Sequence, residues 1–559
     1  MEQEIACPGS NGNVTLRAES FPYSQIPGQS KLFLQYQKDP LSLRTYYPSA
    51  VNSHTEISDR IPDVLANYTT DRELLCDTLA EINKSYNASE KVFENIALLR
   101  KPNTVAVLTG QQAGLFTGPL YTLYKALSAI RAAECLRGRG FDAVPVFWIA
   151  TEDHDFDEVN QAFVLDQNSH LVEFKTEIEH HENAPVGSLL VDNSIDNTIA
   201  QLIASLKVTE FSGELEKIIR KTIVRGDSFG TVFGKLISAL TAEYGLILID
   251  PLHSRIKELA SPIYAEAVRR SSEIVDALIK RSQELESSGF EAQVEVSEDY
   301  FPLFWHSDDG RRLQIRSTGR DTLKVKGLER ELTKDELLNA AENEPWRLSP
   351  SVVLRPVVQD HLFPTICYFG GGAEIAYFAQ NSEVYRCLER PVTPILHRQS
   401  FTVVEGKHKR TMRKYDIGFA DIFEGLDKLL PRVADRFLNE NAAHVFDEVR
   451  KDIEAQLDRL EQSLNEVDMT LAANLETRRK KIRHHLDTLQ RKQQIAEVHK
   501  DDTLHRRLTS IFESLYPRHA LQERTLNITY FLNQYGPRFI DWMYRSTDLD
   551  DRSHRVIYL

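Results

Sequence analysis

The sequence predicts an α/β protein: a Rossmann-like, doubly wound parallel sheet with inserted subdomains, followed by a C-terminal α-helical coiled coil. Short apolar, β-branched runs alternate with helical patterns through the first 400 residues, as in a parallel sheet with helical crossovers. Residues 432–516 contain neither glycine nor proline, and apolar residues recur there at steps of three and four. A chain of 559 residues also exceeds one ordinary core.

The first strand–helix–strand unit is predicted between residues 104 and 150. Residues 56–100 have helical spacing of apolar side chains, and the buried strand "TVAVL" follows them. A helix begins near Pro119, which suits a first helical turn, and "VPVFWIA" at 144–150 is a second buried strand. This order indicates a parallel sheet.

The same rhythm returns at "YGLILID" (244–250) and at "TICYFGGGAEIAYFAQ" (365–380). We therefore assign residues 1–430 to one Rossmann-like core. The segments near 160–235 and 290–345 are polar and strand-like, and we expect them to be insertions.

Residues 431–517 are predicted to form the coiled coil, with apolar positions that include Val449, Leu457, Leu464 and Leu475. One unbroken helix of this length would reach about 130 Å. A hairpin of two helices, or a break near Thr477–Lys481, is therefore expected. Residues 518–559 regain aromatic residues and proline, so this segment should pack back on the core.

Composition limits the partners. The net charge of −15 argues against nucleic acid, because phosphate binding needs a basic surface. The five cysteines are dispersed, which fits reduced thiols in the cytoplasm. The N-terminus has no signal-peptide pattern, and no apolar run approaches the ~18 residues of a membrane span, so no membrane partner is expected.

The stretch "TGQQAGLFTGPLYTLYKA" (109–126) joins a predicted strand to a helix. A glycine-rich turn before a helix N-terminus favours an anion, because unpaired backbone N–H groups point outward there. The candidate anion- or substrate-binding residues are Gln111, Gln112, Gly114 and Gly118. Lys125 lies seven residues after Gly118, so this is not a Walker A motif. The alternative is a tight turn with a buried polar pair.

The stretch "TEDHDFDE" (151–158) follows the second strand, where ligands bind in open α/β sheets. Asp153, His154 and Asp155 are the candidate catalytic residues, with His154 as the base. A solvated helix start and a metal site are the alternatives. The four adjacent residues from Glu152 to Asp155 cannot all face one ion, so no metal ligand is assigned.

Glu374 follows three glycines after another strand, and we expect it to clamp an amino group. It could instead only complement a helix dipole. Arg355 interrupts the apolar run before that strand, and Tyr377 follows Glu374 on the helix. Both join the candidate substrate-binding set.

Five motifs together resemble the family of bacillithiol-biosynthesis cysteine-adding enzymes: "TGQQAGLFTGPLYTLYKA", "PVFWIATEDHDFDEVN", "RPVVQDHLFPT", "GGAEIAYFAQ" and "LQERTLNITYFLNQYG". The resemblance covers the chain from about residue 20 onward. It implies a ligase that joins the carboxyl group of cysteine to the amine of glucosaminyl-malate. It also implies a nucleotidyltransferase-like core, and a coiled coil used for homodimerisation. The chain has Gly371-Gly372-Ala373-Glu374 where the family usually has Gly-Pro-Gly-Glu, and it lacks HIGH and KMSKS signatures.

The resemblance also suggests a nucleotide pocket near the tail, for ATP or ADP as cofactor. The polar and aromatic residues that could line it are Arg518, Gln522, Arg524, Asn527 and Tyr530. Arginine would meet phosphate oxygens through charge-assisted bonds. The alternative for this segment is plain packing.

Two other functions are compatible with these residues. One is a metal-dependent hydrolase or deacetylase centred on Asp153, His154 and Asp155. The other is a non-enzymatic coiled-coil sensor or scaffold.

Overall fold

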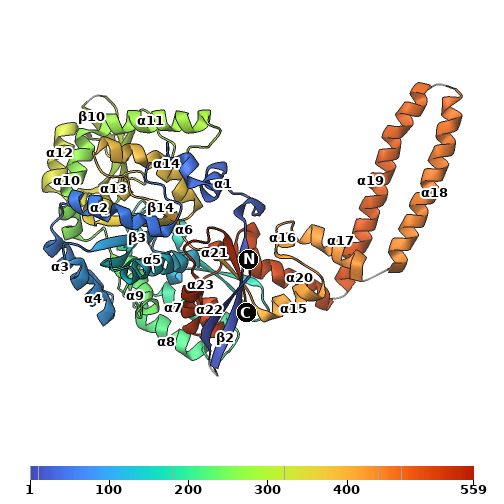
Figure 1. Cartoon of the computed structure of the whole chain (residues 1–559), viewed down its shortest axis with the longest axis horizontal. Coiled ribbons are helices and arrows are strands. Elements are labelled where there is room, and N and C mark those ends of the chain that lie inside the picture. The colour runs from blue at the N-terminus through green and yellow to red at the C-terminus, as the bar shows by residue number, and fades with distance from the viewer. Residues whose placement is uncertain are drawn as a thin grey trace. The chain divides into compact units, whose positions relative to one another are not determined.

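The structure is a computed structural model that describes residues 2–9, 12–179, 182–319, 321–437, 440–467, 469–500 and 502–559. The chain divides into two compact units. The first unit comprises residues up to 402 together with 522–557, and the second comprises 403–521 with the last two residues. Figure 1 labels the elements of both units.

A five-stranded parallel sheet lies at the centre of the first unit, in the order β14-β13-β3-β4-β7. Its strands are β3 (Val105–Gln111), β4 (Ala143–Ile149), β7 (Ile247–Ile249), β13 (Thr365–Gly370) and β14 (Ile395–His397). From β3 the chain adds β4 and then β7 on one side of the sheet. It then returns to the other side of β3, where it adds β13 and then β14. The predicted doubly wound sheet is therefore confirmed, with its switch point between β3 and β13.

The sheet is covered on both faces, which explains its continuous apolar runs. All seven residues of β4 and all six of β13 are buried. Helix α5 (Tyr121–Gly138) packs on β3 and β4, and α14 (Gly372–Cys387) follows β13 directly. Small side chains on α5, among them Ala129 and Ala133, let this helix approach Val105 and Val107 closely.

Residues 54–99 are helical, as the spacing predicts. They form η3 (His54–Arg60), α2 (Ile61–Asn67), α3 (Arg72–Ser85) and α4 (Glu90–Leu99). Asp71 caps α3 by accepting hydrogen bonds from two backbone N–H groups. Earlier in the chain, α1 is Lys31–Lys38.

The segment near 160–235 is only partly strand. A hairpin of β5 (Gln161–Leu165) and β6 (Leu171–Lys175) is followed by α7 (Ser194–Ser205), α8 (Ser212–Thr222) and α9 (Phe229–Leu240). The strand prediction is therefore wrong beyond residue 194. Ile195, Ile199 and Leu202 are buried at helical spacing on α7, a period that the polar composition obscures.

The second insertion contains strands, as predicted, and they form an antiparallel sheet in the order β11-β10-β9-β8-β12. Its strands are β8 (Tyr300–His306), β9 (Arg312–Ser317), β10 (Thr322–Val325), β11 (Glu331–Thr333) and β12 (Leu348–Pro350). The helices around it are α10 (Ser254–Arg269), α11 (Ser271–Ser287), α12 (Lys334–Asn343) and α13 (Arg355–Leu362).

The tail returns to the first unit through α21 (Gln522–Thr525), α22 (Ile528–Tyr535) and α23 (Arg538–Ser546). A four-stranded sheet has the order β1-β2-β16-β15. Its strands are β1 (Glu2–Gly9), β2 (Gly12–Phe21), β15 (Phe401–Val404) and β16 (His554–Tyr558).

The second unit is helical. It contains α15 (Gly406–Lys414), α16 (Phe419–Ile422), α17 (Leu426–Phe437), α18 (Glu440–Asn465), α19 (Met469–Lys500) and α20 (Asp502–Leu515). Helices α18 and α19 form a hairpin (Figure 1). Of the two expected alternatives, the hairpin is confirmed, and the break near Thr477–Lys481 is wrong because α19 runs through it. Arg479 instead joins the two helices by ion pairs to Glu454, Asp458 and Glu461. Within the described ranges, no helix combines the length and apolar content needed to cross a membrane.

Candidate active site at the carboxyl edge of the parallel sheet

Polar segments meet at the carboxyl ends of four parallel strands. They are 111–112 after β3, 151–155 after β4, 370–374 after β13 and 397–398 after β14. This edge, at the switch point of a doubly wound sheet, is where such folds bind ligands.

The loop after β3 is mostly buried, and it turns so tightly that Gly114 and Gly118 lie against each other. A Cβ atom on Gly114 would lie 2.8 Å from the Gly118 Cα, and Gly118 has φ of +70°. The Asn527 side chain donates hydrogen bonds to the carbonyl oxygens of Phe116 and Gly118 at 2.9 and 2.7 Å. The loop glycines are thus explained by the turn itself. A ligand-binding role for Gly114 and Gly118 stays a prediction, and a valine at Gly118 would strain the backbone.

A buried ion pair spans the switch point. Lys125, on the first turns of α5, places Nζ 2.5 Å from Glu374 Oε2 on α14. Lys125 Nζ also donates to Gly110 O at 2.9 Å and to Gln111 Oε1 at 2.8 Å. Glu374 further accepts hydrogen bonds from the Tyr368 hydroxyl and from the Gly371 N–H, both at 2.8 Å. The carboxylate predicted to clamp an amino group therefore holds the protein's own lysine.

The pair is charged but perturbed. Burial lowers the pKa of Lys125 to about 8, although Glu374 opposes this shift. Burial acts to raise the pKa of Glu374, but Lys125 and the Gly371 N–H outweigh it and hold that pKa below its usual value. A buried lysine whose pKa is lowered in this way, beside a specific carboxylate, is a candidate functional group. Sequence reasoning used Lys125 only to exclude a Walker A motif.

Positive charge gathers around the Tyr121 ring. Lys125 Nζ lies 6.0 Å from the ring centroid, and the guanidinium carbons of Arg398 and Arg524 lie 5.4 and 6.0 Å from it. Arg355 also acts on the Lys125 charge. The cations in this group are Lys125, Arg355, Arg398 and Arg524, and the carboxylates in contact with them are Glu374 and Glu523.

Two of these arginines keep an unused donor. Arg355 Nη2 donates to the Tyr377 hydroxyl at 2.6 Å, and Arg398 makes a bidentate pair with Glu523 at 2.7 and 3.0 Å. Yet Arg355 Nε and Arg398 Nε are both buried without a hydrogen-bond partner. Buried unpaired donors of this kind are costly, so each suits an acceptor brought by a ligand.

A second polar group lies after β4. Gln112 Nε2 donates to Asp153 Oδ2 at 2.7 Å, and the His154 backbone N–H donates to Asp153 Oδ1 at 2.8 Å. Arg312 Nη1, on β9, lies 3.3 Å from His154 Nδ1. Gln111 Nε2 faces Gln112 Oε1 at 3.4 Å and so connects this group with the Lys125 group.

The electrostatics keep His154 neutral at pH 7. Burial and the positive charge of Arg312 lower the pKa of His154, against the opposing effect of Asp153. Burial works to raise the pKa of Asp153, but the hydrogen bond from Gln112 and the charge of Arg312 outweigh it, so that pKa falls. Asp155 is exposed and caps the short helix α6 (Phe156–Val159) through the Glu158 N–H at 3.3 Å.

Sequence reasoning missed the cations behind this group. Arg312 also binds Ser349 Oγ and the Pro350 carbonyl at 2.9 Å each, and Lys257 forms a buried ion pair with Glu152. These residues come from α10, β9 and β12, far apart in the chain, so no local motif could reveal them. Across the described part of the chain, no three His, Cys, Asp or Glu side chains come together as a metal site. The metal-hydrolase hypothesis therefore lacks a ligand set.

The structure places four of the five tail residues in the first unit. Gln522, Asn527 and Tyr530 are buried there, and Asn527 holds the loop after β3, whereas Arg518 belongs to the second unit. Arg524 is exposed and lies beside Tyr121, at the sheet edge. A nucleotide-binding role for these residues stays a prediction.

Two family models cover almost the whole chain. Residues 16–399 match the bacillithiol biosynthesis BshC N-terminal Rossmann-like domain, and residues 401–559 match the BshC C-terminal coiled-coil domain. The chain belongs to the BshC family. This confirms the resemblance inferred from the five motifs, together with the fold class of both BshC domains.

Individual BshC relatives are similar over their full length. A Koribacter versatilis protein is 34% identical over 548 residues, which cover 96% of this chain and 99% of the relative. A Salinibacter ruber protein is 32% identical over 543 residues, covering 97% and 98%. Both carry the name "Putative cysteine ligase BshC". The expectation of an enzyme of the ligase class is thus confirmed, against the sensor or scaffold alternative.

Proposed function

We propose that this protein joins the carboxyl group of L-cysteine to the amine of glucosaminyl-malate, forming the amide bond of bacillithiol. The cation group around Tyr121 is the observation that carries the proposal. This chain of net charge −15 places four cations at the sheet edge, among the carboxylates Glu374, Glu523, Glu158 and Asp153, and Arg355 and Arg398 each keep an unpaired Nε donor there. Such donors suit the two carboxylates of a malate group or the oxygens of a phosphate.

The reaction needs activation of the cysteine carboxylate, because a carboxylate is a poor electrophile and amide formation in water runs uphill. An adenine nucleotide, ATP in the forward direction, would supply a leaving group. The unused donor Arg398 Nε and the exposed guanidinium of Arg524 fit phosphate oxygens, whereas the unused Arg355 Nε fits a carboxylate of the malate group.

The remaining residues have distinct roles in this proposal. Lys125 holds Glu374 and the Gln111 side chain in place at the switch point, and Tyr377 fixes Arg355. His154, neutral at pH 7, takes the proton that the attacking amine loses. Arg312 donates to Nδ1 of His154, so the neutral ring carries its proton on Nε2. His154 can therefore accept a proton only at Nδ1, and this requires the 3.3 Å contact with Arg312 to open. Asp153 positions the backbone of His154, and Gln112 holds Asp153 in turn.

Two further features belong to the proposal. We place the enzyme in the cytoplasm, since its five cysteines are all free. We also propose that two copies pair through the α18–α19 hairpin, where Val449, Leu460 and Leu489 stay exposed in the single chain.

Calorimetry with glucosaminyl-malate tests the charge assignment. Arg355→Gln should weaken binding by about 1.5–3 kcal/mol, the value of one charge-assisted hydrogen bond. Arg220→Gln, which removes an exposed arginine paired only with Glu216 on α8, is the matched control and should bind normally. Equal affinity for Arg355→Gln and the wild type would place the malate group elsewhere.

A further inference from the structure

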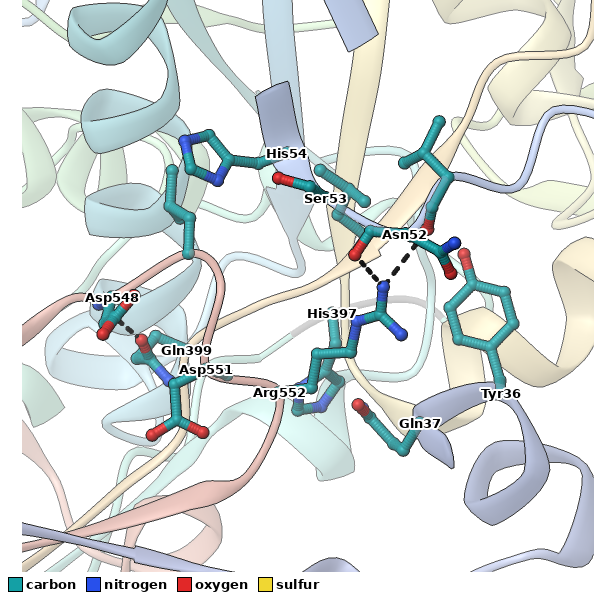
Figure 2. Close-up of a pocket in the computed structure, with 13 residues that line it drawn as sticks. Tyr36, Gln37, Asn52, Ser53, His54, His397, Gln399, Asp548, Asp551 and Arg552 are labelled. Carbon is teal, nitrogen blue, oxygen red and sulfur yellow. Dashed lines mark hydrogen bonds between the residues drawn. The ribbon is translucent and has the colours of Figure 1, made fainter. Parts of the chain in front are cut away.

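A pocket opens beside the end of β14 (Figure 2). Four stretches of the first unit form its walls: α1, the residues around the start of η3, the end of β14 and the loop before β16. It contains about 480 Å³ of free space, part of which is open to solvent. The pocket therefore has room for a small molecule.

Hydrogen bonds hold the walls of this pocket in place. The Tyr36 hydroxyl donates to the Ile395 carbonyl at 2.6 Å, which fixes α1 on β14. The Asp548 backbone N–H donates to Gln399 Oε1 at 2.7 Å, which fixes the C-terminal loop beside the same strand. A ligand would thus enter a pocket that is already formed, and binding needs little rearrangement.

Gln37, on α1, lines the pocket with an amide that lacks hydrogen-bond partners. Its Nε2 and Oε1 atoms are both buried, and neither makes a hydrogen bond with the described part of the chain. Exchanging the two atoms would not help, because both positions lack a partner. A buried, unpaired amide is costly, so it suits a ligand that brings both an acceptor and a donor.

Arg552 adds a positive charge that no carboxylate among the described residues neutralises. Its Nη2 donates to the backbone carbonyls of Val51 and Asn52, whereas Nε and Nη1 make no hydrogen bond to any described residue. Figure 2 shows Arg552 and Gln37 on the same side of the pocket, with Asp548 on the other. A guanidinium with two free nitrogens fits a carboxylate.

His397 lines the pocket with a neutral ring. Burial and the charge of Arg398 lower the pKa of His397 well below its usual value, so the ring is uncharged at pH 7. It packs edge-on against Tyr23, with ring centroids 5.2 Å apart, and can offer one donor and one acceptor. Asp548 and Asp551 also line the pocket, so a polyanion such as phosphate would be repelled.

We propose that this pocket binds a small free 2-amino acid. The ligand carboxylate meets the free nitrogens of Arg552 and the Gln37 Nε2, and the ligand ammonium donates to Gln37 Oε1 and His397. A plain carboxylate would leave Gln37 Oε1 unpaired, and a plain amine would leave Arg552 without an anion. The pocket shares no residue with the groups given a role in amide formation, so it is a second site.

The test is a saturation-transfer NMR titration of the full-length protein with L-alanine. Concentrations up to about 100 mM cover the millimolar affinities expected of so small a ligand. We expect L-alanine to bind the wild type more tightly than propionate, which has the same carbon chain without the amino group.

Two variants locate the binding site. Gln37→Met and Arg552→Gln should each weaken L-alanine binding by about tenfold or more. Gln37→Met should not lower the unfolding temperature of the ligand-free protein, because the amide has no partner to lose. Gln25→Met, at an exposed glutamine before α1, and Arg545→Gln, at an exposed arginine paired with Asp541, are the matched controls and should bind normally.

Three results would overturn the proposal: no L-alanine binding by the folded wild type, equal affinity in the wild type and both variants, or propionate binding as tightly as L-alanine. The titration uses neither glucosaminyl-malate nor a nucleotide. Its result is therefore independent of whether the sheet edge forms an amide.

Discussion

At the scale of single residues, Lys125 carries two roles that can be separated. It neutralises Glu374 in a buried site, and its ammonium faces Gln111 at the switch point. Lys125→Met should destabilise the protein by about 3–5 kcal/mol, because it leaves a buried carboxylate uncompensated. Chemical denaturation measures this loss.

The double variant distinguishes stability from activity. Lys125→Met with Glu374→Gln removes both charges and should recover much of the stability, while product formation stays low. Lys280→Met, at an exposed lysine near Glu284, is the control and should change neither quantity. Full activity in the stable double variant would show that the pair is only structural.

His154 should set the acid limb of the pH profile. A base works in its neutral form, so activity falls as the pH drops through the His154 pKa, which burial and Arg312 hold below its ordinary value. Arg312→Gln removes the positive charge, so the pKa rises and the acid limb of kcat/KM should move to higher pH. His154→Ala should lower kcat/KM by about 10²–10⁴-fold.

Arg316→Gln supplies the matched control on the same strand. Arg316 is paired with Asp299 at 2.9 Å and should leave the limb in place. If the acid limb of the Arg312→Gln profile does not shift, His154 is not the group that accepts the proton.

The sequence predicted one side of each of these contacts. Gln111, Gln112, His154 and Glu374 follow strands, and the rule on strand ends locates them without coordinates. The charged residues packed behind and beside them, Arg312, Lys257, Arg398 and Glu523, come from distant segments. Only tertiary pairing identifies those, because a lone arginine in a polar stretch has no periodic signal.

At the scale of elements, the strands were predictable where both faces are buried, since β3, β4 and β13 read as unbroken apolar runs. Helix α7 was not, because its helical spacing is confined to one short stretch within a longer segment that is polar in overall composition. The hairpin of α18 and α19 was one of two alternatives that the sequence left open, and the position of its turn was not predicted. Neither glycine nor proline marks it, and ion pairs between the helices fix where the hairpin closes.

The hairpin leads to a test of self-association. Val449 is 40% and Leu460 46% exposed on α18, which a lone helix pair would present to water. Val449→Asp with Leu460→Asp should give monomers in sedimentation, while the wild type sediments as a dimer. Lys480→Asp with Lys481→Asp, at exposed polar positions of α19, should remain dimeric. A wild-type monomer at high micromolar concentration would refute pairing.

At the scale of the whole molecule, both family domains and relatives matched over their full length indicate one enzyme architecture. The chemistry depends on the first unit, which contains the sheet edge, the cations around Tyr121 and the His154 group. In the proposed reaction, the chain supplies binding groups and a base there, and a nucleotide supplies the driving force.

The most direct measurement is turnover by the purified full-length protein with L-cysteine, glucosaminyl-malate and ATP, followed by mass spectrometry. We predict bacillithiol in the complete mixture, with nucleotide consumed in proportion to amide formed, and none when cysteine or ATP is omitted. Lys125→Met with Glu374→Gln should form little product under the same conditions. Absence of product from folded wild-type protein in the complete mixture would contradict the assignment, and product formation without any nucleotide would contradict nucleotide-driven activation.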